Sequence, residues 1–144
     1  MKIGDEVAIF APNLNADLPL PYTKTGISAG FPSPADDFLD LQIDLNKHLI
    51  KHPSSTFYGR VTGNSMMGAG IHHGDLLVID KSLEPKNNKI AVCFLDGEFT
   101  VKRIKIDKDI IWLIAENKDY QPIRVTKDND FLIWGIVTNV IKYL

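Results

Sequence analysis

Short apolar segments separated by turn residues fill the second half of the chain. Six of them are rich in β-branched or aromatic residues, which favour strands; they cover residues 56–61, 76–80, 89–95, 98–106, 110–115 and 131–143. The pair Asp96-Gly97 predicts a tight hairpin, because a type I′ turn needs positive φ at both central residues. Asp107-Lys108-Asp109 predicts the next turn. We therefore expect a mostly β fold of twisted antiparallel strands.

The first part of the chain has a different pattern. Five of the eight prolines precede residue 37, and prolines at this spacing prevent a long helix and remove hydrogen-bond donors from strands. Next, Leu45, Leu49 and Ile50 form an apolar stripe behind Asp44, a suitable N-cap, and Pro53 ends the segment. The sequence thus predicts an extended N-terminal arm over residues 1–37, then a β-rich domain over 38–144 with one short helix.

Composition narrows the class of protein. At 144 residues and 44% hydrophobic, the chain can bury a core of its own. A net charge of −2 lacks the clustered basic excess of duplex-binding proteins, so we expect no direct DNA binding. No apolar run reaches the roughly 18 residues that span a bilayer, and the N-terminus lacks the apolar core of a signal peptide. We expect a soluble, cytoplasmic protein without membrane contact.

Cofactor and thiol chemistry find little support in the sequence. The single cysteine, Cys93, excludes an internal disulfide, and its apolar surroundings favour a buried packing residue over a reactive thiol. Gly68-Ala69-Gly70 does not continue into a phosphate-loop or dinucleotide-binding pattern. The four histidines and one cysteine also lack metal-ligand spacing. We expect no cofactor and no metal.

One serine and one lysine are the strongest candidates for chemistry. Ser65 lies in a turn bracketed by glycines at 63, 68 and 70, which suits the display of a hydroxyl and of backbone N–H groups that stabilise an oxyanion. Lys102 lies in an apolar strand, on the same face as Thr100 and Ile104. A serine needs a base, and a lysine can be that base near neutral pH only if a dry site lowers its pKa by roughly three. The pair indicates a Ser/Lys hydrolase.

Less specific interpretations exist for each of these residues. A lone strand lysine commonly lays its stem over apolar surface and keeps its ammonium in water, and a serine beside glycine is commonly an ordinary turn residue. A Ser/His/Asp arrangement of Ser65, His73 and Asp75 is improbable, because residues so close in sequence do not readily reach the required geometry.

Three blocks together resemble a known family. Gly63-Asn64-Ser65-Met66-Met67, then the run from Gly70 to Asp80, then Asp96-Gly97-Glu98-Phe99-Thr100-Val101-Lys102-Arg103 are similar to the LexA/UmuD family of self-cleaving serine peptidases in order and spacing. The likeness extends upstream to residue 28, through Gly30-Phe31-Pro32-Ser33-Pro34-Ala35. It favours a UmuD-type member, because 29 residues with three prolines cannot hold the helix-turn-helix domain of LexA-type repressors.

The resemblance implies a site and a substrate. It assigns Ser65 as nucleophile, Lys102 as general base and the bond between Ala29 and Gly30 as the point of self-cleavage, within a LexA/UmuD-like peptidase fold. Backbone amides of Asn64 and Ser65 would stabilise the oxyanion. The small Ala-Gly pair in a proline-rich arm also suits an extended chain that enters a groove.

The resemblance also implies partners. It predicts a homodimer whose cleavage is promoted by a RecA filament on single-stranded DNA during the SOS response. The processed dimer would join a UmuC-like Y-family polymerase in error-prone translesion synthesis. Two alternatives remain: a non-cleaving interaction module of the same fold, and a signal-peptidase-like Ser/Lys hydrolase that acts on other proteins. The apolar setting of Lys102 argues against the first, and the lack of a membrane anchor argues against the second.

Overall fold

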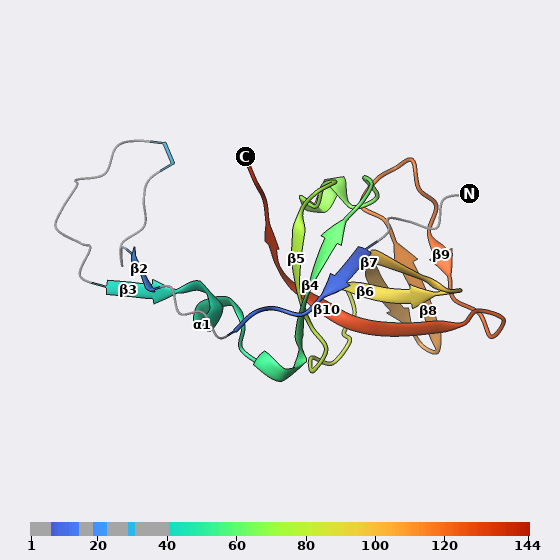
Figure 1. The fold of residues 1–144 in the computed structure, drawn as a ribbon. Coiled ribbons are helices and arrows are strands. Elements are labelled where there is room, and N and C mark those ends of the chain that lie inside the picture. The colour runs from blue at the N-terminus through green and yellow to red at the C-terminus, as the bar shows by residue number, and fades with distance from the viewer. Residues whose placement is uncertain (1–6, 15–18, 23–28, 31–40) are drawn as a thin grey trace. The chain divides into compact units, whose positions relative to one another are not determined.

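The protein is described by a computed structural model for residues 7–14, 19–22, 29–30 and 41–144 (Figure 1). It divides into two compact units, one of Met1–Pro12 with Ser54–Leu144 and the other of Asn13–Pro53. The predicted boundary between residues 37 and 38 lies outside the described residues. Each unit is considered separately below.

The larger unit is built on one antiparallel sheet of eight strands, with the order β1-β4-β5-β10-β6-β7-β8-β9 (Figure 1). All neighbouring pairs run antiparallel, which confirms the predicted mostly β fold. In chain order the strands are β1 (Val7–Phe10), β4 (Thr56–Val61), β5 (Leu76–Asp80), β6 (Ile90–Leu95), β7 (Glu98–Asp107), β8 (Ile110–Ile114), β9 (Ile123–Arg124) and β10 (Phe131–Ile141).

The six predicted strands are all present, with ends that differ by at most two residues. Strand β1 was not predicted, since Val7–Phe10 belongs to the segment assigned to the arm. This segment is apolar and free of proline, and it pairs with β4 from Val7 opposite Val61 to Phe10 opposite Tyr58. This pairing satisfies the backbone hydrogen-bonding groups along one side of β4. The stabilisation depends on contact with a distant segment, so the sequence of these four residues does not reveal it.

Both predicted hairpin turns are confirmed by their backbone angles. Asp96 and Gly97 have φ values of 49° and 91°, the positive pair that a type I′ turn requires. The Asp96 carboxylate also accepts hydrogen bonds from the Asn129 side chain and the Asp130 amide, at 2.7 and 2.8 Å. Lys108, at φ 55°, turns the chain from β7 into β8.

The smaller unit holds a two-stranded pair and the predicted helix. Strand β2 (Pro19–Tyr22) pairs with β3 (Leu41–Asp44), and helix α1 (Leu45–Leu49) follows at once. The Asp44 carboxylate accepts a hydrogen bond from the Asn46 amide at 3.0 Å, which confirms Asp44 as the N-cap.

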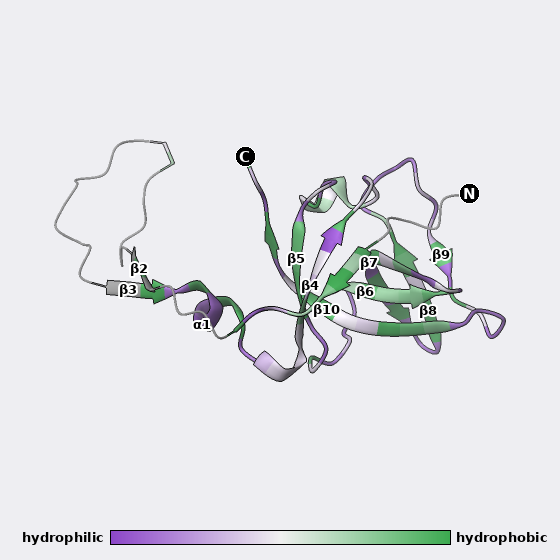
Figure 2. Cartoon of the chain, viewed as in Figure 1, coloured by the Kyte–Doolittle hydropathy of each residue, from purple (hydrophilic) through white to green (hydrophobic). Residues whose placement is uncertain are grey.

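The core of the larger unit lies on both faces of the sheet at β6 and β7. Val92 and Val101 belong to one buried apolar cluster, whereas Cys93 and Ile104 belong to a second. Because successive strand residues point to opposite faces, both faces of these two strands are covered. Figure 2 shows the corresponding concentration of apolar residues on the strands, with polar residues on the turns. A side chain on β7 can therefore be buried on either face.

The end of β10 is tied to the turn that precedes β5. Lys142, just after the strand, forms an ion pair with the buried Asp75 carboxylate, which also accepts a hydrogen bond from the His72 amide at 2.8 Å. Burial alone would raise the pKa of Asp75, but the hydrogen bonds from Lys142 and His72, with the charge of Lys142, outweigh it and hold the pKa below its usual value of 3.8.

The lowered pKa predicts a pH-dependent contribution to stability. The stabilisation that the Asp75 carboxylate provides is present above pH 3.8, its pKa in the unfolded chain, and is lost as the pH falls through its folded pKa. We expect Asp75→Asn to lower the free energy of unfolding by about 1–3 kcal/mol at neutral pH, with the gap narrowing as the pH falls below 3.8. Urea unfolding of both proteins at several pH values on both sides of 3.8 measures this, and a gap that does not narrow at acidic pH would contradict it.

Candidate active site

Ser65 lies in the loop that joins β4 to β5. The chain leaves β4 through Gly63, at φ 99°, and passes Ser65 before a short 3₁₀ turn at Met67–Ala69 that ends at Gly70, at φ 81°. These two glycines adopt the left-handed conformation that other residues avoid. Ser65 and Met66 are fully buried, so the turn carries its hydroxyl into the protein.

Lys102 lies near the middle of β7, and only 1% of its surface is exposed to solvent. Its Nζ donates hydrogen bonds to Ser65 Oγ at 2.9 Å, to Thr100 Oγ1 at 2.9 Å and to the Val101 carbonyl at 3.1 Å. The small side chain of Ala91 is opposite Lys102 in the register of β6 and β7. The Lys102 amine is therefore not exposed to water, as it would be in a lysine that only lays its stem over apolar surface. The structure brings together the two residues that the sequence singled out.

The contacts of Lys102 suit both protonation states of its amine. As an ammonium, Nζ donates to all three oxygens. As a neutral amine it keeps two N–H donors, which Thr100 Oγ1 and the Val101 carbonyl can accept, and turns its lone pair toward the Ser65 hydroxyl. Burial penalises the charged form, whereas the three oxygen acceptors favour it. The separation of Nζ and Oγ is within the range over which a neutral amine accepts a hydroxyl proton.

Two residues after β8 support the serine loop. The Glu116 carbonyl accepts the Gly68 amide at 2.7 Å, and Asn117 Nδ2 donates to the Asn64 carbonyl at 2.9 Å. Glu116 also forms an ion pair with Arg103, the neighbour of Lys102 on β7. The sequence analysis missed Glu116 and Asn117, because nothing in a loop sequence marks contacts with residues about 50 positions away.

The histidines near Ser65 have structural partners. His73 Nδ1 accepts a hydrogen bond from the Gly63 amide at 3.2 Å, at the entrance to the serine turn. Asp75 is engaged by Lys142 and by the His72 amide. These contacts give the Ser/His/Asp alternative no support.

Cys93 is a fully buried, free cysteine on β6, opposite Thr100 of β7. Burial raises the pKa of its thiol to about 12, although the charge of Lys102 acts in the opposite direction. Cys93 thus stays a neutral packing residue near neutral pH, as expected from the sequence.

The residues of the expected cleavage point belong to the smaller unit. Ala29 and Gly30 form a bend, and both are exposed.

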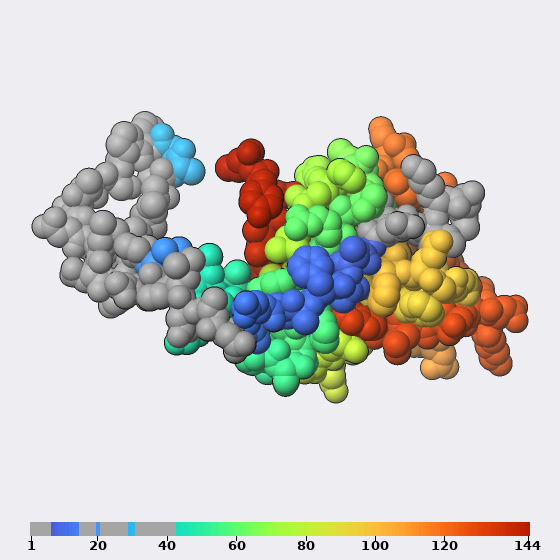
Figure 3. Space-filling model, in the orientation of Figure 1, coloured from blue at the N-terminus to red at the C-terminus, as the bar shows by residue number. Residues whose placement is uncertain are grey.

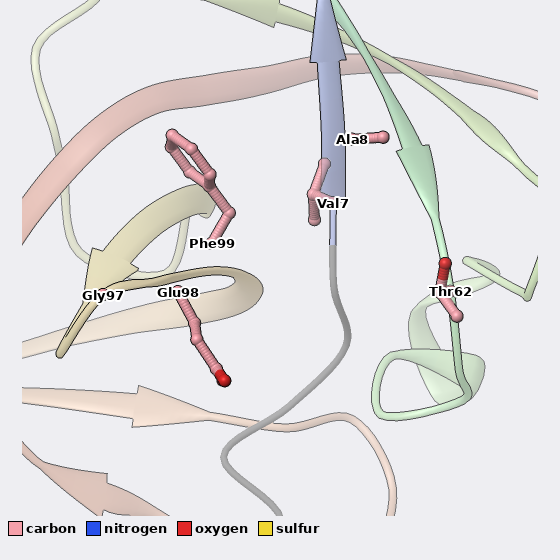
Figure 4. Close-up of a pocket in the computed structure, with 6 residues that line it drawn as sticks. All are labelled: Val7, Ala8, Thr62, Gly97, Glu98 and Phe99. Carbon is pink, nitrogen blue, oxygen red and sulfur yellow. The ribbon is translucent and has the colours of Figure 1, made fainter.

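A pocket of about 270 Å³ opens where β1 approaches the β6–β7 hairpin (Figure 4). Figure 3 shows β1, in blue, beside the yellow residues of that hairpin. It is lined by Val7, Ala8, Thr62, Gly97, Glu98 and Phe99. Phe99 and Lys102 are three residues apart on β7, so their side chains point to opposite faces of the strand. Neither Ser65 nor Lys102 lines the pocket.

Two further features bear on the class of site. Over residues 7–14, 19–22, 29–30 and 41–144, no three His, Cys, Asp or Glu side chains gather in a way that suits a metal ion. Within the same residues, no helix is both long and apolar enough to cross a membrane.

Comparison with known proteins places this chain in a family. Residues 21–138 match the family described as Peptidase S24-like. Protein MucA of Escherichia coli is 40% identical over 121 residues, which cover 83% of this chain and 82% of the relative. Protein SamA of Salmonella typhimurium is 42% identical over 113 residues, or 78% of each chain.

A repressor also shares the matched region. LexA repressor 1 of Pseudomonas syringae pv. tomato is 38% identical over 117 residues, which cover 81% of this chain but 57% of the repressor. The LexA/UmuD resemblance read from the three sequence blocks is thereby confirmed. With a family match over most of its length and relatives near 40% identity, the chain belongs to the Peptidase S24-like family.

Proposed function

We propose that this protein is a self-cleaving serine peptidase that cuts its own arm between Ala29 and Gly30. The observation that carries the proposal is the 2.9 Å hydrogen bond between Lys102 Nζ and Ser65 Oγ, two buried side chains from segments 37 residues apart. A lysine is rarely buried without a specific use or partner. Membership of a peptidase family supports the same reading.

The first step joins the serine to the arm. Neutral Lys102 takes the Ser65 proton, and Oγ attacks the carbonyl carbon of Ala29. The N–H groups of Asn64 and Ser65 stabilise the negative charge on the carbonyl oxygen. Thr100 Oγ1 and the Val101 carbonyl hold the amine in place during this transfer.

The second step releases the product. The Lys102 ammonium returns its proton to the amine of Gly30, the bond between Ala29 and Gly30 breaks, and an ester forms between Ser65 and Ala29. Water then attacks the ester, with Lys102 again as the base, and restores the free serine. Cleavage removes 29 residues and leaves 144 − 29 = 115.

The wider role follows from the UmuD-type resemblance. A homodimer of the chain is cleaved when a RecA filament forms on single-stranded DNA, as part of SOS mutagenesis. The processed dimer then serves as an accessory subunit of a UmuC-like Y-family polymerase. The similarity to MucA and SamA over most of their lengths supports this assignment over a repressor role.

Removal of either member of the pair is expected to stop cleavage. Ser65→Ala removes the nucleophile, and Lys102→Met keeps the apolar stem but removes the base, whose loss costs roughly 10²–10⁴-fold in rate. Purified protein incubated at alkaline pH is analysed by mass spectrometry for the 115-residue fragment that begins at Gly30. Lys105→Met, at an exposed position of the same strand, is the matched control and should cleave like the wild type.

The alternatives give different outcomes in this experiment. If the protein is a non-cleaving interaction module, the wild type and all three variants stay intact, even with activated RecA. A hydrolase that acts only on other proteins would leave its own arm uncut but would cleave a separate peptide that spans residues 25–35. Either result would refute self-cleavage.

The rate of cleavage should depend on pH through Lys102. Because the active form is the neutral amine, we expect the rate to rise with pH, by about tenfold per pH unit while the amine is mostly charged, and then to level off. Rates measured from pH 6 to 11 give this profile, and a flat or falling profile would be inconsistent with a lysine base.

Thr100 should matter for the rate through its contact with the amine. Thr100→Val keeps the shape but removes the oxygen that accepts from Lys102 Nζ, a hydrogen bond of about 1 kcal/mol, so we expect roughly fivefold slower cleavage. Thr138→Val, which removes a hydroxyl that donates to the Val78 carbonyl on β5, serves as control. Equal rates for both variants would show that the Thr100 contact is dispensable.

A further inference from the structure

The carbonyl of the peptide that joins Asn64 to Ser65 is held from a distant part of the chain. The Asn64 carbonyl accepts hydrogen bonds from Asn117 Nδ2 at 2.9 Å and from the Met67 amide at 3.3 Å. The Met67 bond is a local turn contact at the long end of the range. The Asn117 bond is shorter and comes from a separate segment, 53 residues away.

A fixed carbonyl also fixes the N–H on the other side of the same peptide. The peptide group is planar and trans, so its C=O and N–H point in opposite directions. The N–H of this peptide belongs to Ser65, one of the proposed oxyanion donors. If the peptide rotated, the Ser65 N–H would turn away and the Asn64 oxygen would take its place. The contact from Asn117 holds the peptide against that rotation.

Asn117 is itself held in one orientation. Its Oδ1 accepts a hydrogen bond from the Asp119 amide at 3.0 Å, which leaves Nδ2 as the group directed at Asn64. Its neighbour Glu116 accepts the Gly68 amide, and a Cβ at Gly68 would lie only 2.7 Å from the Glu116 oxygen. The two backbones are thus in close contact, and Arg103 links Glu116 to the strand of Lys102.

We infer that Asn117 is a positioning residue for the self-cleavage reaction: its carboxamide orients the Asn64–Ser65 peptide so that the Ser65 N–H faces the developing oxyanion. The inference rests on the proposed function and adds to it a residue outside the three sequence blocks. Loss of a direct oxyanion donor costs roughly 10²–10³-fold in rate. Asn117 acts through the peptide, so its loss should cost about 10–100-fold.

The test is the substitution Asn117→Asp in the full chain. Aspartate keeps the oxygen that accepts from the Asp119 amide but cannot donate to the Asn64 carbonyl, which it repels. Asn87→Asp is the matched control, because Asn87 uses only its oxygen toward the Ile106 amide and keeps that contact as aspartate. Asn117→Ala removes the donor without adding charge. For each protein, we measure the cleavage rate from pH 6 to 11 and the thermal unfolding midpoint.

A positioning role predicts a lower plateau rate with an unchanged pH midpoint. Asn117→Asp and Asn117→Ala should cleave about 10–100-fold more slowly than wild type at the plateau, while the pH of half-maximal rate and the unfolding midpoint stay close to those of Asn87→Asp. If the pH midpoint or the unfolding midpoint shifts together with the rate, Asn117 acts on Lys102 or on folding, and the inference is wrong.

Failure of the inference can be told apart from failure of the proposed function. Wild-type cleavage with unchanged plateau rates in both Asn117 variants overturns the inference alone. A wild type that stays intact at every pH and with activated RecA overturns the proposed function, and the role of Asn117 in cleavage falls with it.

Discussion

Burial of the Lys102 amine beside a hydroxyl is the constraint on which the rest of the structure depends. An amine at 1% exposure loses its hydration and must find partners inside the protein. Ser65 Oγ, Thr100 Oγ1 and the Val101 carbonyl supply them, at 2.9 to 3.1 Å. Water is kept away from this part of β7 because both faces of the sheet are covered. A flat sheet with one solvated face would not exclude water in this way.

The same buried environment affects two potential nucleophiles, Cys93 and Ser65, in different ways. Cys93, opposite Thr100, has a thiol whose pKa burial raises to about 12, so it remains protonated. Ser65 has its hydroxyl within hydrogen-bond reach of the Lys102 amine. Desolvation therefore leaves Cys93 inert, whereas under the proposed function the neighbouring amine makes Ser65 reactive. A hydroxyl activated by a base it can reach is the more effective nucleophile in such a site.

Support for the serine loop comes from two separate parts of the chain. His73 contacts the Gly63 amide from the turn before β5, and Glu116 and Asn117 contact Gly68 and Asn64 from the loop after β8. Arg103 connects that loop to β7. Catalytic geometry must be held to within fractions of an ångström, and a loop can reach that precision only when neighbouring elements fix its backbone. The loop here is restrained on both sides of Ser65.

The sequence by itself determined the local features of this protein. Apolar runs set the six long strands, Asp96-Gly97 set a hairpin because its backbone angles are a local property, and Asp44 capped the helix for the same reason. Three blocks of residues were specific enough to indicate the family. Strand parity indicated that Lys102 shares a face with Ile104, and both side chains are buried.

Only the tertiary structure decided the remainder, because it depends on which distant segments meet. Val7–Phe10 became a strand through pairing with β4, and Lys102 became buried through coverage of both faces of β7. The 2.9 Å approach of Lys102 to Ser65 and the contact of Asn117 with Asn64 join residues 37 and 53 positions apart. Local propensity carries no information on such pairs, since their free energy arises only when the folded sheet brings them together and excludes water from between them.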